Sequence, residues 1–452
     1  MLSSLRNRSV AFVAAFASFL TARAFAGESH YNHYAVGERA GGMGGAFTAL
    51  ADEATGAYYN PAGILDAPRR GQAAMGVTVS AYQLAALRYE SRVSLGDRAQ
   101  DFSTSSFTTF ASAFGYVHTF GKARAHAVGL TITVPENESY SGSVSLGGAK
   151  VAASPRTSGV EITNADFTQS FRPSAQTILF GLTYAARPHA RVSVGASLLY
   201  ALRRENSVSS FFLTGDTPGG RVALTESSRF ESLHGALAGE VGMKIRATDH
   251  LRFGLALRTP TARIHQRATT YQAPSEGTPI LAGPSELDVY SPEPLRLSFG
   301  VAWEVPKRYT LALDVRWFGS VDPYSPLLFN LANGATGRAA DLSRRHVVNV
   351  ALGGEWRVTE AIALRGGFFT DFTARPTEDP KLNGPDHVNL FGLTFAFAWL
   401  TAETTLSLGV NWAFGAGDVP GVRNRGTDAE EVFNASATRH FVTFFLGGSY
   451  SL

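Results

Sequence analysis

The chain has 452 residues, a formal net charge of +3 and no cysteine. The lack of cysteine excludes disulfides, thiol catalysis and thiolate metal sites. The net charge is small for this length and the basic residues are scattered, so the composition gives no indication of a nucleic-acid-binding face.

The N-terminus has the layout of a secretory signal peptide. Arg6 and Arg8 precede an apolar run over residues 10–20, which is followed by Ala-Phe-Ala at residues 24–26. A membrane-spanning helix needs about 20 apolar residues, so this run is too short to be an anchor. We therefore predict a signal peptide over residues 1–26, cleaved after Ala26, and an exported protein.

Residues 27–70 are rich in Gly, Ala and Tyr and show no alternation of apolar and polar side chains. The alternation begins after them and continues to the end of the chain, so the sequence divides into an N-terminal segment over 27–70 and a strand region over 71–452. The clearest strand covers residues 251–258, where large apolar side chains occupy the odd positions and small or charged ones the even positions.

The alternation predicts fourteen strands, with uncertain ends. Their approximate ranges are 72–91, 105–118, 123–135, 168–186, 190–206, 230–246, 250–265, 289–304, 308–320, 343–357, 361–372, 387–401, 403–416 and 437–452.

Short and long connections alternate along these strands. The short ones include 121–122, 187–189 and 305–307, and the long, Ser/Thr/Gly-rich ones include 136–167, 207–229, 266–288 and 417–436. Outer-membrane barrels have short periplasmic turns and long extracellular loops, whereas a soluble sandwich or propeller has no reason to separate connection lengths in this way. We therefore predict an all-β, fourteen-stranded antiparallel transmembrane barrel of the outer membrane, with both chain ends in the periplasm.

The five tryptophans support an apolar face turned towards lipid. Each lies on the apolar face of a predicted strand, close to a connection: Trp303, Trp317, Trp356, Trp399 and Trp412. This placement predicts aromatic girdles at the two membrane interfaces. The opposite strand faces carry charges such as Glu240 and Asp314, which we expect to line the lumen.

Residues 37–63 carry the motif that identifies a family. Its main features are Gly41, Gly42, Gly44, Gly45, Asn60, Pro61, Ala62 and Gly63, and further matches are Arg258-Thr259-Pro260 and residues 364–368. The motif resembles the N-terminal signature of the FadL/TodX family of outer-membrane transporters for long-chain fatty acids and other hydrophobic compounds. The resemblance implies that residues 27–70 form a hatch, or plug, inside the barrel lumen. Accessory barrels of PorV type, used in secretion or surface assembly, carry a similar motif and remain the alternative.

The family resemblance implies passive transport by loop capture, hatch rearrangement and lateral release. Two apolar triplets in predicted loops are candidates for ligand capture, although packing between loops explains them equally well: Phe211-Phe212-Leu213 and Ile280-Leu281-Ala282. Arg258 and Arg316 are expected in the lumen and are candidates for binding a carboxylate headgroup.

The sequence gives no indication of catalysis. It has no G-x-S-x-G motif, its glycine cluster lacks the G-x-G-x-x-G spacing, and no third metal ligand accompanies His30 and His33. We therefore expect a monomeric non-enzyme without metal or cofactor. Its expected partners are outer-membrane lipids and a hydrophobic small molecule, not nucleic acid.

Overall fold

The computed structural model describes residues 29–32, 35–67, 71–95, 98–151, 161–274, 290–324, 328–330, 336–338, 342–376, 387–424 and 430–452. The predicted signal peptide lies outside these residues and stays a prediction.

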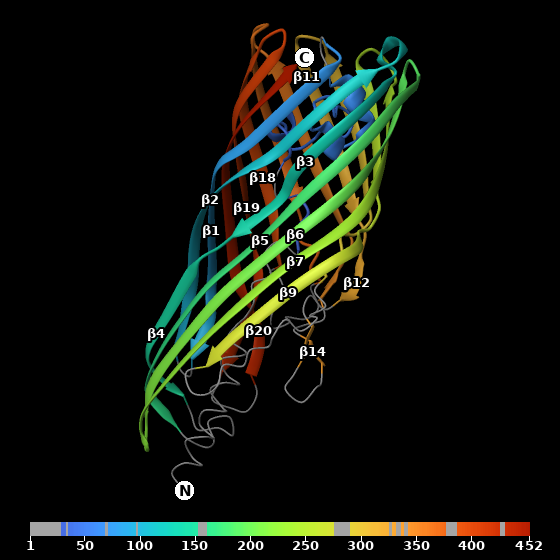
Figure 1. Cartoon of the computed structure of the whole chain (residues 1–452). Helices are drawn as coiled ribbons and strands as arrows, with labels where there is room; N and C mark the ends of the chain where they lie inside the picture. The colour runs from blue at the N-terminus through green and yellow to red at the C-terminus, as the bar shows by residue number, and fades with distance from the viewer. Residues whose placement is uncertain are drawn as a thin grey trace.

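The described strands form one closed antiparallel barrel of fourteen staves (Figure 1). The staves are β1 (Ala73–Leu95), β2 (Arg98–Phe120), β3 (His126–Ser139), β5 (Ile162–His189), β6 (Val192–Thr217), β7 (Gly220–Arg246), β8 (Leu251–Arg258), β10 (Arg296–Val305), β11 (Tyr309–Phe318), β16 (Val347–Arg357), β17 (Ile362–Asp371), β18 (His387–Leu400), β19 (Thr404–Asn424) and β20 (Glu430–Ser451). The barrel closes because β1 pairs with β20 and β3 pairs with β5. The predicted barrel and its strand number are confirmed.

Six further short elements accompany the staves. β4 (Gly142–Val151) continues the line of β3 along β5, and β9 (Ala262–Pro274) continues the line of β8 along β7. Two small hairpins are formed by β12 (Val321–Tyr324) with β15 (Leu342–Arg344) and by β13 (Leu328–Asn330) with β14 (Thr336–Arg338).

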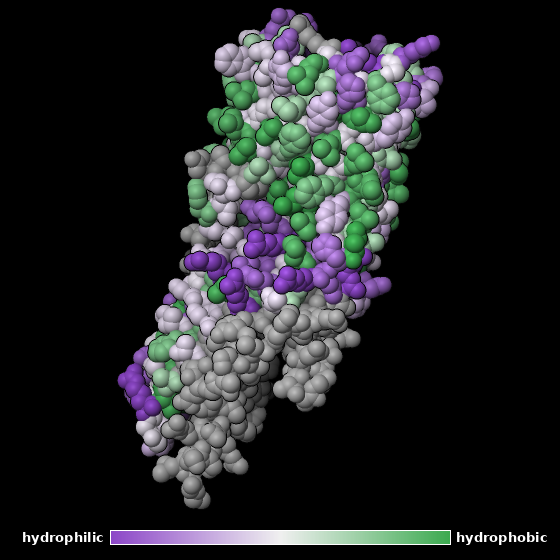
Figure 2. All heavy atoms as spheres, in the orientation of Figure 1, coloured by the Kyte–Doolittle hydropathy of each residue, from purple (hydrophilic) through white to green (hydrophobic). Residues whose placement is uncertain are grey.

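The large apolar side chains of the staves face outwards. On β8, Leu255 is 40% exposed, whereas the next residue, Ala256, is 2% exposed and faces the lumen. Four of the five tryptophans are at least 42% exposed on the same outer surface. Figure 2 shows, on the face in view, hydrophobic side chains gathered over the part of the barrel that carries the short turns; we call this outer surface the apolar belt. An apolar outer belt over a polar lumen is the arrangement that a lipid bilayer requires.

At the opposite end, strand occupies part of each of the four long connections named above, which corrects their prediction as loops. β6 and β7 are joined by only two residues, and β19 and β20 run to Asn424 and from Glu430. The Ser- and Thr-rich stretches continue the strand alternation outside the apolar belt, where water can contact both faces and the apolar signal of a strand is lost.

The barrel is much taller on one side. β5, β6 and β7 contain 28, 26 and 27 residues, whereas β8, β10, β11 and β17 contain 8 to 10. Figure 1 shows the long strands extending well past the short ones, away from the end where the C-terminus lies. We call β4 to β7 the tall wall.

Residues 35–67 lie inside the barrel, near the end with the short turns (Figure 1). We call them the plug. They form α2 (Glu38–Gly42), η1 (Gly56–Tyr58) and η2 (Pro61–Asp66), and nearly every residue is buried. No helix among the described residues is long and apolar enough to cross a bilayer.

Candidate functional site

The plug is a tightly turned chain whose bends are set by the glycine and Asn-Pro motifs. Gly44 and Gly45 have φ values of 63° and 77°, in the left-handed region that favours glycine. Asn60 caps η2, because its side-chain oxygen accepts a 3.0 Å hydrogen bond from the backbone N–H of Ala62, and Pro61 starts the helix. The motif residues therefore shape the backbone of the plug.

Two buried arginines join the plug to the barrel wall. Arg39 of α2 contacts Asp52 at 2.7 Å within the plug and Glu355 of β16 at 3.0 Å. Arg365 of β17 contacts the same Glu355 at 2.8 Å and reaches Glu38 of α2 at 2.7 Å. The charges alternate in sign through this network, so each buried ion has an opposite neighbour, as buried charges require.

Asp314 of β11 is a second attachment point. Its carboxylate accepts hydrogen bonds of 2.9 Å from the backbone N–H groups of both Phe47 and Thr48. The side chain of Asn60 donates to the carbonyl oxygens of Thr48 and of Met243 on β7, both at 3.0 Å. Asp314 thus satisfies buried backbone N–H groups of the plug, while Asn60 of the plug satisfies one backbone carbonyl of the plug and one of the wall.

The last turn of the plug is held by a cluster of cations. Asp66 contacts Arg187 at 2.6 Å, Lys244 at 2.8 Å and also Arg246, which come from β5 and β7. Burial opposes ionisation of Asp66, but the neighbouring cations outweigh it and lower the pKa of this carboxyl to about 2. Asp66 therefore stays charged and paired over the physiological pH range.

Glycines of the barrel wall contact the plug, and they were not identified from the sequence. At eight inward positions on eight different strands, a Cβ atom would collide with the plug: Gly115, Gly195, Gly242, Gly254, Gly300, Gly353, Gly367 and Gly447. At Gly300, for example, it would lie 2.8 Å from the backbone nitrogen of Ala49. The signal for these residues was present in the small side chains at the inward positions of the strands. We call the ion pairs, Asp314 and these glycines the plug seat.

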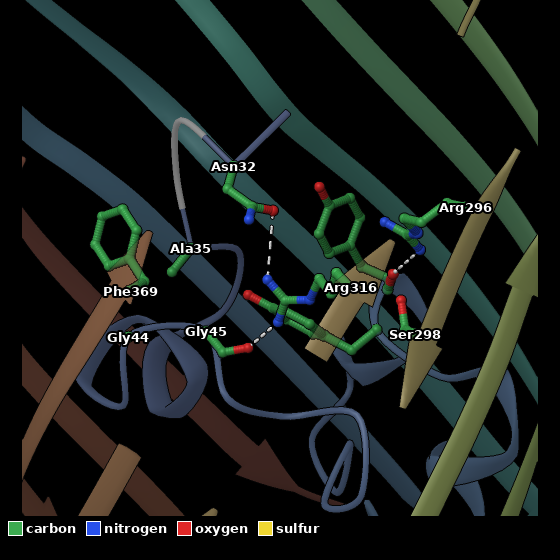
Figure 3. Close-up of a pocket in the computed structure, with 10 residues that line it drawn as sticks. Asn32, Ala35, Gly44, Gly45, Arg296, Ser298, Arg316 and Phe369 are labelled. Atoms are coloured by element: carbon green, nitrogen blue, oxygen red, sulfur yellow. Dashed lines mark hydrogen bonds between the residues drawn. The ribbon is translucent and has the colours of Figure 1, made fainter. Parts of the chain in front are cut away.

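A pocket lies above the plug, between Gly44 and Gly45 on one side and Tyr58 and Tyr59 on the other. Figure 3 shows Arg316 of β11 reaching into it, where its guanidinium donates to the carbonyl of Gly45 and, at 3.4 Å, to the side chain of Asn32. The cavity volume is about 20 Å3, which is enough for about one water molecule. An organic ligand can enter only if the plug shifts.

Charged side chains of both signs surround this pocket. Arg258 and Arg296 share a single carboxylate, Glu240, at 2.7 Å each, and Arg316 pairs with Asp314 at 3.0 Å. A third carboxylate, that of Asp371, accepts a 3.1 Å hydrogen bond from the backbone N–H of Asn32, which lines the pocket. Arg296 was not among the candidates from sequence; its place on the inward face of β10, beside Arg258 in the strand register, brings it to the pocket.

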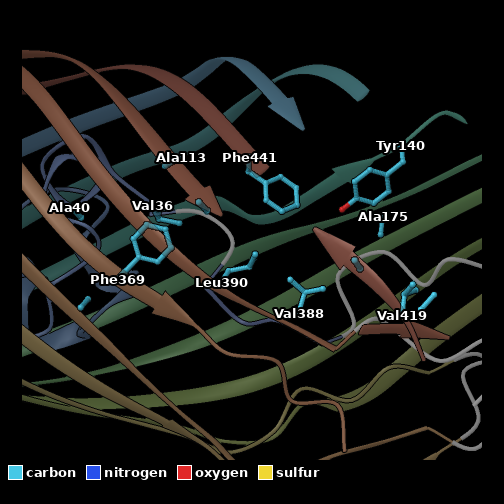
Figure 4. Packing of buried hydrophobic residues seen from close by; sticks show 14 of the residues in the cluster. Val36, Ala40, Ala113, Tyr140, Ala175, Phe369, Val388, Leu390, Val419 and Phe441 are labelled. Atoms are coloured by element: carbon cyan, nitrogen blue, oxygen red, sulfur yellow. The ribbon is translucent and has the colours of Figure 1, made fainter. Parts of the chain in front are cut away.

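Buried apolar side chains continue from the plug to the far end of the lumen. The apolar track consists of Tyr140, Val144, Leu146, Phe167, Phe211, Leu213, Val388, Leu390, Val419 and Phe441, and it forms one cluster with Val36, Met43 and Phe47 of the plug. Figure 4 shows its middle part, where Phe441 and Tyr140 lie on one side and Val388 and Leu390 on the other. The track is apolar from the tall wall down to the plug, but buried ion pairs lie beside it, among them Arg439 with Glu138.

The sequence matches no protein-family model and no curated protein. Several solved structures are nevertheless similar over nearly the whole chain. A Pseudomonas aeruginosa FadL homologue is 15% identical, with a TM-score of 0.60 over 94% of this chain and 100% of that one. The Pseudomonas putida toluene transporter TodX (12%, TM-score 0.58, 93% and 99%) and the Ralstonia pickettii toluene transporter TbuX (13%, 0.55, 93% and 99%) are also similar. The fold is that of the FadL-type barrels.

The structure places the predicted ligand residues differently from expectation in one respect. Phe211, Phe212 and Leu213 lie in strand β6 and not in a loop, because the hairpin of β6 and β7 continues above the apolar belt. Phe211 and Leu213 face the lumen and are 2% and 4% exposed, whereas Phe212 faces outwards and is 44% exposed. Only the first and third can belong to the apolar track.

Of the other predicted ligand residues, Ile280 and Leu281 lie outside the described residues. Arg258 and Arg316 both face the lumen, but β10 lies between their strands, and each already has a carboxylate partner. Their role in binding a headgroup stays a prediction.

Proposed function

We propose that this protein is an outer-membrane channel for the passive transport of hydrophobic compounds, with both chain ends in the periplasm. The observation that carries the proposal is the apolar track, which leads from the tall wall to the pocket above a removable plug. The outer apolar belt and the FadL-type fold support the membrane placement. The proposed drive is the transfer of apolar surface out of water, worth roughly 25 cal/mol per Å2.

The ligand first binds along the apolar track. Phe167 and Phe211, from neighbouring strands of the tall wall, pack with their ring centroids 5.1 Å apart and are 1% and 2% exposed. The ligand has to displace the side chains that cover these rings; the rings can then bind apolar chains of different shape, because the hydrophobic effect is not directional.

The guanidinium of Arg316, which reaches into the pocket, favours a ligand with a carboxylate group. A carboxylate that reaches Arg316 competes with the carbonyl of Gly45 and the side chain of Asn32 for the same guanidinium. It can form two parallel charge-assisted hydrogen bonds, which are stronger than a bond to a neutral carbonyl oxygen. In this mechanism, binding of the headgroup loosens the plug at the glycine turn and opens the pocket.

The exit proposed for the ligand is a split in the barrel wall between β2 and β3. The two strands pair only from Ala113 with Thr133 to Phe120 with His126. Beyond Thr133 no pairing between the two strands is present, and β3 has a bulge against β5 between Thr133 and Glu136 that contains Pro135. Ala113, 3% exposed, belongs to the same apolar cluster as the plug and the track. A ligand at this point can leave sideways into lipid without crossing the charged plug seat.

Uptake of fatty acids of increasing chain length into cells that depend on this protein tests the proposal. We expect uptake to increase with length, since each buried CH2 contributes about 0.8 kcal/mol. Flat uptake that equals that of a strain lacking the protein would contradict transport and favour the accessory-barrel alternative.

The headgroup role is tested by the ratio of acid to alcohol uptake at equal chain length. We expect Arg316→Lys to lower this ratio by about tenfold, since lysine cannot form the paired hydrogen bonds. Because acid and alcohol are compared in one variant, any loosening of the plug cancels. Arg191→Lys, at an exposed turn far from the pocket, is the control, and an unchanged ratio in Arg316→Lys would argue against a headgroup contact.

A further inference from the structure

Four exposed arginines lie on the outer surface of the tall wall and of β9: Arg172 on β5, Arg204 on β6, Arg229 on β7 and Arg267 on β9. We call them the arginine patch. Figure 2 shows a hydrophilic band crossing the front of the molecule, directly beside the hydrophobic belt, over the strands that Figure 1 labels β5, β6, β7 and β9.

The strand register places these arginines in two rows. Arg204 and Arg267 are both Cα partners of Leu233, one from each side. Arg172 and Arg229 are likewise both Cα partners of Val208. Two arginines in a row are thus separated by two strand spacings, or about 10 Å, which lets their side chains converge on one group between them. Leu233 is 38% exposed and Val208 40%, so both rows face outwards.

The patch carries unbalanced positive charge. Arg229 pairs with Glu231 at 2.5 Å, and this pair is exposed. Within the described part of the chain, Arg172, Arg204 and Arg267 form no ion pair with a carboxylate. The four arginines and one glutamate leave a net charge of +3 on a small area, which favours an anionic partner.

The patch also borders the surface that faces lipid. Leu198, on the strand that carries Arg204, is 57% exposed, and Leu182 on the strand of Arg172 is 63% exposed. Between these leucines and the arginines lies an interfacial pair, in which the hydroxyl of Tyr200 and Nε2 of His265 are 2.7 Å apart. Along one line of the surface, apolar side chains are thus followed by an aromatic pair and then by guanidiniums.

We propose that the arginine patch binds the phosphorylated headgroup of a lipid in the outer leaflet. The inference rests on the outer-membrane placement proposed above. Guanidiniums bind phosphate through paired hydrogen bonds, and cations next to a bilayer attract anionic headgroups. The order of side chains argues for a lipid over a soluble anion, since one amphiphile can place its acyl chains on Leu198 and Leu182 and its phosphates between the arginines. Bound phosphate would also relieve the repulsion among the four arginines and hold the tall wall at the membrane surface.

Lipid binding to the full-length protein in an uncharged detergent tests the proposal. The probes are bisphosphorylated lipid A and the same lipid with its phosphates removed, and bound lipid is counted by native mass spectrometry. We expect the phosphorylated form to bind at least about tenfold more tightly, and Arg204→Gln with Arg267→Gln to remove most of this difference. The matched control is Arg191→Gln with Lys307→Gln, which removes two exposed cations at the short turns and should leave binding unchanged.

Three results would overturn the proposal: equal binding of both lipid forms, an equal loss in the control, or displacement of lipid A by inorganic phosphate at the same concentration. Selective capture of an acidic protein by the patch, with no preference between the lipids, would also overturn it. Fatty-acid uptake measured in the same variants separates the two proposals. Uptake without lipid A binding contradicts only the lipid site, whereas lipid A binding without uptake contradicts only the transport function.

Discussion

The plug seat and the apolar track differ in chemistry, although buried ion pairs such as Arg203 with Glu136 also lie beside the track. The plug seat is polar: Arg39, Glu355 and Arg365 are buried and joined by ion pairs of 2.8 to 3.0 Å. The apolar track above it consists mainly of side chains without polar groups, such as Phe167 and Phe211; its Tyr140 donates a hydrogen bond to Glu138. Both regions lie inside the same barrel, so burial alone does not decide whether the side chains there are charged or apolar.

The difference in chemistry between the plug seat and the apolar track corresponds to what each region must hold. Buried ion pairs contribute little net stability, but they are specific in geometry and costly to break singly, so they suit one partner in one position. Apolar surface accepts any apolar partner at similar free energy per area. A seat of ion pairs therefore fixes the plug, while an apolar track suits a transient and variable ligand.

The largest effect is expected from removing the plug. Deletion of residues 35–67 should leave a folded barrel, because the plug contributes no strand to the closed sheet. Ion conductance in planar bilayers should rise by about an order of magnitude or more, since fourteen staves enclose a lumen that the remaining side chains do not fill. Heat-modifiable gel mobility checks folding. A deletion variant that folds but conducts like the intact protein would show that the plug does not close the lumen.

Removing one buried arginine of the seat, and with it two ion pairs, should have the next largest effect. Arg365→Met leaves Glu38 and Glu355 buried with less compensation, and breaking a buried pair in this way costs about 3–5 kcal/mol. We expect the backbone amides of Gly41 and Met43, which are hydrogen-bonded within the first turn of the plug, to lose hydrogen-exchange protection of that order.

The control for this substitution is Lys307→Met. Lys307 forms an exposed pair with Glu360, with side chains 76% and 90% exposed, and such pairs contribute little. Equal loss of protection in both variants would mean that the ion pairs of the seat do not hold the plug.

A smaller, pH-dependent effect is expected from Glu53, a plug residue whose carboxyl lies beside the start of α2. Burial, together with the nearby charge of Glu38 and against the opposing charge of Arg365, raises its pKa from 4.5 to about 8. When the plug leaves its seat, the carboxyl is hydrated, regains its ordinary pKa and releases its proton. The seated state is therefore favoured below pH 4.5 and loses this advantage as the pH rises to about 8.

Channel openings in planar bilayers should accordingly become more frequent as the pH is raised through this window. Glu53→Gln, which stays neutral, should flatten the dependence and keep the plug seated at high pH. A dependence that is unchanged in Glu53→Gln would assign the titration to another group.

The outward and inward faces of the strands can be predicted from the sequence, whereas much of the apolar track cannot. The alternation of Leu255 and Ala256 is enough to predict the lipid-facing and lumen-facing sides of a strand, because a bilayer imposes a strict period of two. The strand at Phe211 was predicted as a loop, since outside the bilayer its Ser- and Thr-rich neighbours carry no strong alternation. The part of the apolar track that lies on the tall wall was therefore recognised only as isolated apolar residues.

The residues of the plug seat can be identified only when the register of the strands is known. Arg296 was one of many inward charges in the sequence, and only its alignment beside Arg258 brings it to the shared carboxylate of Glu240. The inward glycines, such as Gly300, become meaningful only when the backbone of the plug is placed against them. Contacts between segments that are hundreds of residues apart leave no periodic signal in the sequence.

The smallest effect is expected from single substitutions on the tall wall, which test whether the ligand follows the apolar track. Phe211 and Phe212 are adjacent and chemically identical, but the first is 2% exposed in the apolar track and the second is 44% exposed on the outer surface. Phe211→Ala should lower fatty-acid uptake by about tenfold, because the ligand loses apolar contact area on its path. Phe212→Ala should change uptake by less than about twofold, since exposed substitutions away from a site have small effects.

Gel mobility checks that both barrels fold, and ion conductance should be unchanged in both, because neither side chain contacts the plug seat. Equal losses of uptake in the two variants would show that the ligand does not follow the inner face of the tall wall, and the apolar track would then serve packing alone.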